Sequence, residues 1–89
     1  MQSRIAIIGI IVEETQNVAQ LNQVLHEYGQ YIVGRMGIPY QKRGVHIISV
    51  AMDAPQDKIN ALSGKLGKIP GIRSKTAYSQ LVYENEGTD

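Results

Sequence analysis

The first thirty residues contain two different patterns of apolar residues, a continuous run followed by a periodic segment. Residues 4–13, RIAIIGIIVE, are almost continuously apolar and rich in isoleucine. Such a run is typical of a central strand whose two faces are both covered. The next segment places apolar residues at three- and four-residue spacing, which predicts an amphipathic helix. The apolar residues of this helix are Val18, Leu21, Val24, Leu25 and Tyr28.

The middle of the chain predicts two strands joined by a turn. The second strand covers about residues 31–39 and the third covers residues 45–53, VHIISVAMD. Between them lies the glycine-rich basic segment GRMGIPYQKRG, residues 34–44, which we interpret as the hinge of a long hairpin. The residues of the second strand expected on one face are Ile32, Gly34, Met36 and Ile38.

A second helix and a fourth strand complete the predicted elements. Asp53-Ala54-Pro55 opens the helix, and Asp57 lies in its first turn, where the helix dipole favours an acid. Pro70-Gly71 ends it, and the last strand covers residues 72–78. The apolar residues of this helix are Ile59, Leu62, Leu66 and Ile69.

The element order is therefore strand, helix, strand, strand, helix, strand. This order predicts an α+β, ferredoxin-like βαββαβ sandwich with a four-stranded antiparallel sheet and two helices on one face. Right-handed crossovers give the strand order 4-1-3-2. Residues 1–79 are expected to form this single domain, and residues 80–89 an acidic C-terminal tail.

The sheet face without helices is also apolar in the predicted fold. Because an apolar face of this kind is usually covered, we expect a second copy of the chain to pack there, giving a homo-oligomer, a dimer or a tetramer. The residues expected on this face are Ile5, Ile7, Ile11, Val45, Ile47 and Ala51.

Composition restricts the classes of site that the chain can hold. It has 89 residues, which suits one modest core, and it has no cysteine, so disulfides and thiolate chemistry are excluded. The first apolar run is far shorter than the roughly 20 residues that span a bilayer. We therefore expect no membrane association and a cytoplasmic location.

The net charge is +1, but positive charge gathers in residues 42–75. This basic segment could face an anionic partner or form an ordinary solvated surface.

Few side chains suggest catalysis or metal binding. His26 and His46 are the only histidines, and neither has a second ligand at chelating spacing, so His26 is at most a weak metal candidate. Glu13-Glu14 and Asp53 are expected at the ends of adjacent strands, which would make them neighbours, but capping and solvated turns explain them better than acid–base chemistry does. Residues 64–67, GKLG, match a nucleic-acid-binding GxxG pattern but lack the helix that should follow it. No enzymatic activity is expected.

The hinge carries the strongest candidate for a binding site. Its cations could gather around an anion beside an aromatic ring, with glycines allowing close approach of the backbone. The alternative is a solvated hairpin end whose charges discourage edge-to-edge aggregation. The candidate ligand-binding residues are Arg35, Met36, Gly37, Tyr40 and Arg43.

Three blocks of the sequence, HEYGQYIVGRMGIPY, GVHIISVAMDAP and ALSGKLGKIPGI, resemble the small regulators named for the iron-only hydrogenase system. The resemblance covers roughly residues 4–79. More distantly, that family is similar to ACT domains and to the C-terminal domain of nickel-responsive repressors, which oligomerise and bind small ligands. It implies an effector-sensing regulatory role.

The sequence also departs from those distant relatives. The histidines and the cysteine that hold nickel have no counterpart in Met36-Gly37-Ile38-Pro39, and only His26 could correspond to a ligand position. The DNA-binding segment of the repressors has no counterpart either, so an effect on transcription is expected to run through a protein partner that targets DNA or through an unrecognised surface. The effector and any cofactor stay unknown. Two other functions stay open: an interaction module without a ligand, and a nucleic-acid-binding domain.

Overall fold

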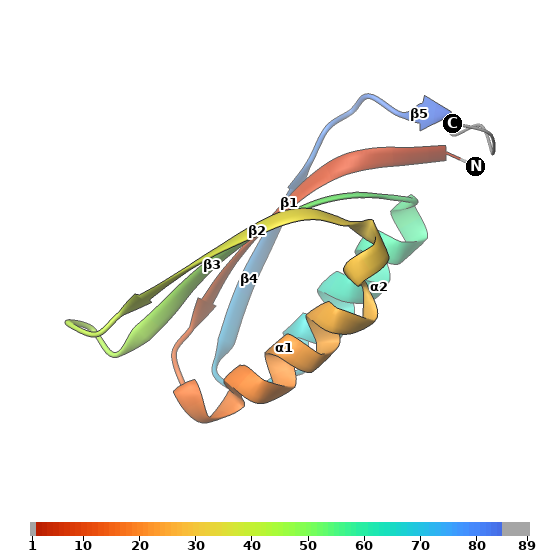
Figure 1. Cartoon of the computed structure of the whole chain (residues 1–89). Coiled ribbons are helices and arrows are strands. Elements are labelled where there is room, and N and C mark those ends of the chain that lie inside the picture. Colours follow the sequence, from red (N-terminus) through yellow and green to blue (C-terminus); the bar gives the residue numbers. More distant parts are fainter. Residues whose placement is uncertain (1, 85–89) are drawn as a thin grey trace.

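The computed structural model describes residues 2–84, which form two helices and five strands in an α+β arrangement (Figure 1). Short 3₁₀ turns precede and follow the first helix, at Thr15–Asn17 and Gly29–Tyr31. The strands and helices are β1 (Gln2–Val12), α1 (Val18–Glu27), β2 (Ile32–Tyr40), β3 (Val45–Ala54), α2 (Gln56–Gly67), β4 (Ile72–Tyr78) and β5 (Tyr83–Glu84).

The main path of the sheet runs β2-β3-β1-β4, and every pair in it is antiparallel. Both helices lie on one side of this sheet, as Figure 1 shows. The predicted strand order is therefore confirmed. The predicted strand count of four is wrong, because Tyr83–Glu84 pairs with Gln2 and Ser3 of β1 as a fifth strand. This strand lies in the segment expected to be a tail, and residues 85–89 of that segment lie outside the described residues.

The core lies between the sheet and the two helices. Along β1 and β3, alternate side chains face the helices and are almost fully buried; Ile8 is 0% exposed, whereas its neighbour Ile7 is 51% exposed. Thus β1 is covered on one face within the chain, and covering of its other face stays a prediction. The helices contribute buried residues at three- and four-residue spacing, which are Leu21, Leu25, Ile59, Leu62 and Leu66.

A β-bulge divides β2 into two parts. Ile32 pairs with Met52 and Gly34 pairs with Ala51, so Val33 is an extra residue with no partner on β3. Because successive strand residues alternate between faces, this extra residue reverses the alternation beyond it. The expectation that Ile32 shares a face with Gly34, Met36 and Ile38 is wrong for this reason: Ile32 lies on the helix side with Met52, and the other three lie on the open side.

The turn between α2 and β4 packs against the loop that follows β1. The backbone N–H of Glu13 donates to the carbonyl oxygen of Gly71 at 2.7 Å, and the Asn17 side-chain amide donates to the carbonyl oxygen of Pro70. Gly71 has a φ of 75°, in the left-handed region that favours glycine. These contacts fix the end of β1 beside the start of β4.

Candidate functional site

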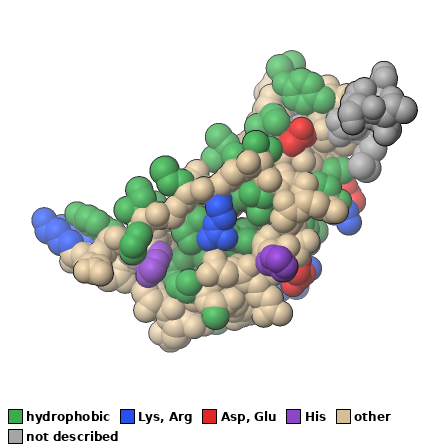
Figure 2. Space-filling model, viewed as in Figure 1, with side chains coloured by type: hydrophobic (Ala, Val, Ile, Leu, Met, Phe, Trp, Pro, Cys, Tyr) green, Lys and Arg blue, Asp and Glu red, His purple; other side chains and the backbone are tan. Residues whose placement is uncertain are grey.

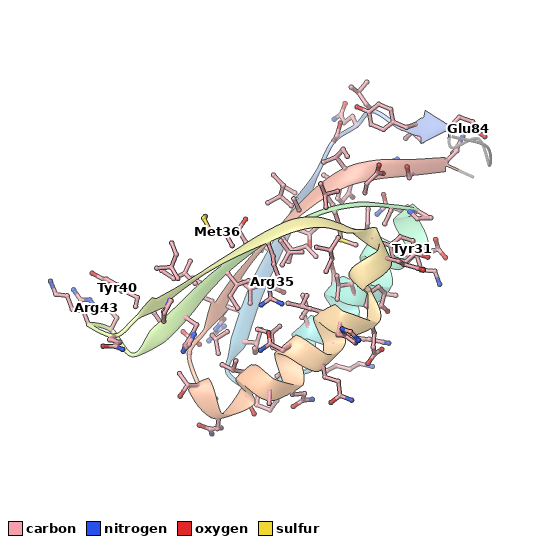
Figure 3. The ribbon with its side chains drawn as sticks, viewed as in Figure 1. Tyr31, Arg35, Met36, Tyr40, Arg43 and Glu84 are labelled. Carbon is pink, nitrogen blue, oxygen red and sulfur yellow. The ribbon has the colours of Figure 1, made fainter. Side chains whose placement is uncertain are left out.

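The bulge directs Arg35 to the helix side of the sheet, toward α1. Arg35 pairs in register with Val50, whose side chain is fully buried among core residues. Its guanidinium Nη2 donates a hydrogen bond to Oδ1 of Asn22, in the middle of α1, at 3.0 Å. Figure 3 shows the Arg35 side chain reaching from β2 into the space between that strand and the helix. The hydrogen bond joins two elements that otherwise diverge here.

A cleft of about 280 Å³ surrounds this hydrogen bond. Its base is apolar, because Leu25 of α1 is almost fully buried and Ile32 of β2 is half-buried. His26 follows Asn22 by four residues, so both side chains lie on the same side of α1. The cleft is lined by Asn22, Leu25, His26, Gly29, Ile32 and Arg35.

The charge of Arg35 is not neutralised by a carboxylate within residues 2–84, where its hydrogen-bond acceptor is an uncharged amide. Two glutamates elsewhere in the described residues already have cationic partners. Glu27 of α1 pairs with Lys65 of α2 at 3.0 Å, and Glu13 pairs with Arg73 at 3.1 Å. The hydrogen bond that the Lys65 ammonium donates to the Glu27 carboxylate raises the pKa of Lys65, and this ammonium also lies 5.1 Å from the centre of the Tyr28 ring.

The other residues predicted for the site do not gather around Arg35. Met36 and Tyr40 belong to the open side of the sheet, since they pair with Ser49 and Val45. Tyr40 and Arg43 lie at the far end of the β2–β3 hairpin, where the Arg43 N–H donates to the Tyr40 carbonyl oxygen at 3.2 Å (Figure 3).

Gly37 alone shares the helix side of β2 with Arg35 among the predicted residues. A Cβ added to it would touch only Ile48, at 3.9 Å. The sequence prediction missed Asn22, although a signal was present: Asn22 and His26 stand four residues apart on the polar face of a predicted helix.

The open face of the sheet is the second candidate surface. Its exposed apolar side chains surround a shallow hollow of about 580 Å³, in which Gly9 of β1 lies opposite Ser49 of β3. Arg73 and Lys75 of β4 border the hollow. Figure 2 shows green apolar side chains along this upper edge of the molecule. The exposed residues of the face are Ile5, Ile7, Ile11, Met36, Ile38, Tyr40 and Ile47.

The proposed carboxylate pair is not assembled by the fold. Asp53 pairs with Ile5 near the start of β1, whereas Glu13 and Glu14 follow the end of that strand. At about 3.4 Å per residue, these groups are separated by nearly the whole strand. The expectation that they are neighbours is wrong, because the end of an antiparallel strand meets the beginning, not the end, of its partner.

Two further sequence features have plain structural outcomes. Residues 64–67, GKLG, lie inside the last turn of α2 and do not form the loop that a nucleic-acid clamp requires. Within the described residues, no three histidine or acidic side chains cluster closely enough to hold a metal ion. In the same part of the chain, no helix has the length and apolarity needed to cross a membrane.

Comparison with known proteins identifies the family. A family model, TM1266-like, matches residues 4–76, and its description reads "Iron-only hydrogenase system regulator, putative". The chain belongs to this family. The resemblance noted in GRMGIPY and its flanking blocks is thereby confirmed. Among curated proteins, none matches the sequence.

The solved structures that are similar to this member of the TM1266-like family include an uncharacterized protein and an enzyme. The uncharacterized protein TM1266 from Thermotoga maritima is 36% identical, with a TM-score of 0.82, over 85% of this chain and 96% of that one. A formyltetrahydrofolate deformylase from Pseudomonas putida KT2440 is 14% identical, with a TM-score of 0.60, over 82% of this chain and 28% of the deformylase. At that identity, the second likeness concerns the fold alone.

Proposed function

We propose that the chain is a non-enzymatic regulatory module that senses a small ligand or ion as a homo-oligomer. The observation that carries this proposal is the α1–β2 cleft, where the Arg35 guanidinium has a neutral partner in a chain whose family is described as regulatory. Enzymatic activity has no comparable support. Within residues 2–84, Glu13 and Glu27 are paired with cations, and nearly the whole length of β1 separates Asp53 from Glu13 and Glu14, so these carboxylates do not form an acid–base pair.

The proposal includes a ferredoxin-like, ACT-like fold. Its support is the βαββαβ order and the β2-β3-β1-β4 path with both helices on one side. β5 is then an addition at the end of β1, outside the four-stranded path. In folds with this layout, one face of the sheet stays available for contact with another copy.

We further propose that a second copy covers the open face. With strands about 4.8 Å apart and about 3.4 Å per residue, four strands over the nine β1–β3 pairs present a footprint of about 590 Å². Two such faces bury about 1,200 Å², at the lower limit of specific interfaces, so association should depend on protein concentration. The open face has a hollow at Gly9 and protruding side chains at Ile7 and Ile11. In a two-fold dimer the same surface packs against itself, so a face with both a recess and protruding residues can be self-complementary.

Sedimentation velocity over a concentration series tests this assembly. A rise in mass from the 9.8 kDa chain to a multiple of it is expected, and Ile7→Glu should abolish the rise by placing a charge at the centre of the face. Val33→Glu is the matched control, because Val33 is 72% exposed and has no partner on β3. A monomer at every concentration, or equal effects of the two variants, would contradict assembly through this face.

An interaction module without a ligand is the second candidate, and the exposed isoleucines of the open face favour it. Thermal unfolding with metals, carboxylates, amino acids and nucleotides separates the two candidates. A ligand of the folded form at a hundredfold excess over its Kd should add about 2.7 kcal/mol of stability. If none of these compounds shifts the midpoint of thermal unfolding while the chain still self-associates, an interaction module without a ligand is the better explanation. We also propose that an effect on transcription, if the module has one, runs through a protein partner that binds DNA.

A further inference from the structure

We propose that the cleft between α1 and β2 binds a small organic carboxylate, whose two oxygens are held by the Arg35 guanidinium and whose apolar part lies on Leu25 and Ile32. This inference rests on the proposed ligand-sensing function and adds to it a place and a chemical class.

The position of Arg35 is the first observation. Arg35 lies on the helix side of the sheet, and the residue beside it on β3, Val50, is fully buried. A guanidinium has five N–H donors in a planar fork, and Asn22 accepts from one of its nitrogens. The hydrogen bond fixes the side chain across the cleft and leaves further donors for a planar, bidentate acceptor.

The size and lining of the cleft restrict the ligand. A volume of about 280 Å³ lies just below the roughly 300–1,000 Å³ of pockets for drug-sized molecules, which favours a ligand smaller than a nucleotide. Leu25 and Ile32 give the base an apolar surface suited to a short alkyl group, which inorganic phosphate lacks. Gly29 keeps one wall open, because a Cβ built there meets no atom within 4 Å.

The charges of the lining decide between a carboxylic acid and an amino acid. Asn22, His26 and Arg35 are the polar side chains of the cleft, and no carboxylate is among its lining residues. An ammonium group in this cleft would therefore lie near a guanidinium without a negative partner, which is unfavourable. His26 can add a hydrogen-bond donor toward an anion. The chemistry favours a carboxylate that carries no amino group.

A titration followed by ¹H–¹⁵N NMR tests the site at the about millimolar affinity expected for so few ligand atoms in an open cleft. The probes are 3-methylbutanoate, leucine and inorganic phosphate. With 3-methylbutanoate, saturable shifts are expected at the amides of His26, Gly29, Ile32 and Arg35. Leucine and phosphate should bind at least about tenfold more weakly, because one adds an uncompensated charge and the other has no apolar part.

Variants connect these shifts to the guanidinium. Arg35→Gln should weaken the binding of 3-methylbutanoate about 10- to 100-fold. Arg35→Lys keeps the positive charge but loses the planar fork of donors, so its affinity should lie between those of Arg35→Gln and the wild type. Arg43→Gln is the matched control, because it removes the same charge at the far end of the hairpin and should leave the affinity unchanged. Gly29→Leu offers a second test that keeps Arg35 and fills the open wall; weaker binding is expected. A dispersed spectrum and an unchanged unfolding midpoint establish that each variant is folded.

The outcomes separate this inference from the proposed function. Equal binding of phosphate or leucine, equal losses in Arg35→Gln and Arg43→Gln, or no shift with 3-methylbutanoate would each overturn the carboxylate site. If a metal or a nucleotide still stabilised the protein in that last case, ligand sensing would stand at another site. If 3-methylbutanoate bound in the cleft but left the sedimentation of the chain unchanged, the site would be supported and its regulatory role would fail.

Discussion

Gly71, in the turn between α2 and β4, should be the glycine least tolerant of a side chain. Its φ of 75° is strained for any L-residue with a Cβ. A Cβ built there would also lie 2.5 Å from Cβ and 2.6 Å from Cγ of Glu14, closer than real contacts allow. Gly71→Ala therefore combines a backbone cost with a collision, and the Glu13–Gly71 hydrogen bond prevents the loop from moving away freely.

Gly44 allows the two costs to be separated. It has a similar φ of 67°, but a Cβ there meets nothing within 4 Å. The left-handed conformation costs an alanine about 1–2 kcal/mol, partly offset by about 0.4–1 kcal/mol from the stiffer unfolded chain, so Gly44→Ala should lose about 1 kcal/mol. A collision of this kind adds about 1–3 kcal/mol, which gives about 2–4 kcal/mol for Gly71→Ala.

Urea unfolding followed by circular dichroism at one fixed protein concentration measures both losses. A shift of the midpoint at constant m-value reports stability, and each kcal/mol corresponds to about 4–8 °C in Tm for a chain of this size. Adding Glu14→Gly to the Gly71→Ala variant should restore the stability lost through the contact with the Glu14 side chain. It should not restore the stability lost because alanine is strained at a positive φ. If Gly71→Ala and Gly44→Ala agreed to within about 0.5 kcal/mol, the packing of this turn against Glu14 would be wrong.

Three further predictions concern α2 and are measured by the same unfolding experiment. Gly64→Ala should stabilise the protein by about 1 kcal/mol, since Gly64 lies inside the helix with open space around it; a loss would contradict this. Leu62→Ala, at a fully buried position, should cost about 2–5 kcal/mol, and a loss below 1 kcal/mol would contradict its central place in the core. The hydrogen bond to Glu27 raises the pKa of Lys65 above 10.5. The contribution of this ion pair to the stability of the folded protein is therefore complete below pH 10.5, and it is lost as the pH rises through the pKa of Lys65 in the folded state. Wild type should therefore lose more stability than Lys65→Gln above pH 10.5, and parallel profiles would refute the assignment.

The sequence predicted the main architecture because the periods of its apolar residues differ clearly between strands and helices. The alternation in VHIISVAMD assigned Val45, Ile47 and Ala51 to the open side of β3. It thereby leaves Ile48, Val50 and Met52 for the other side, where all three are buried. β5 was missed because it is two residues long and lies in an acidic segment. Such a short pairing depends on where β1 places Gln2 and Ser3, which no local pattern records.

The candidate site was less predictable than the fold. Arg35 was selected as a cation near glycines, but its neighbours were taken from the same hairpin, whereas the structure supplies Asn22 and His26 from a helix. The grouping with Tyr40 and Arg43 assumed that closeness in sequence means closeness in space. A nine-residue strand separates its ends by about 25–30 Å, so the assumption fails along β2.

The bulge at Val33 has a consequence for comparing related chains. Removing Val33 would leave Ile32, Gly34 and Arg35 with the β3 partners they have now, so the chain can lose one residue here without exchanging its two faces. The loss of one residue farther along β2 would instead turn every later side chain over. An alignment of related chains across β2 should therefore match residues that occupy the same face of the sheet. If residues were matched only by their distance in sequence from a glycine, a charged residue of the cleft could be aligned with an apolar residue of the open face.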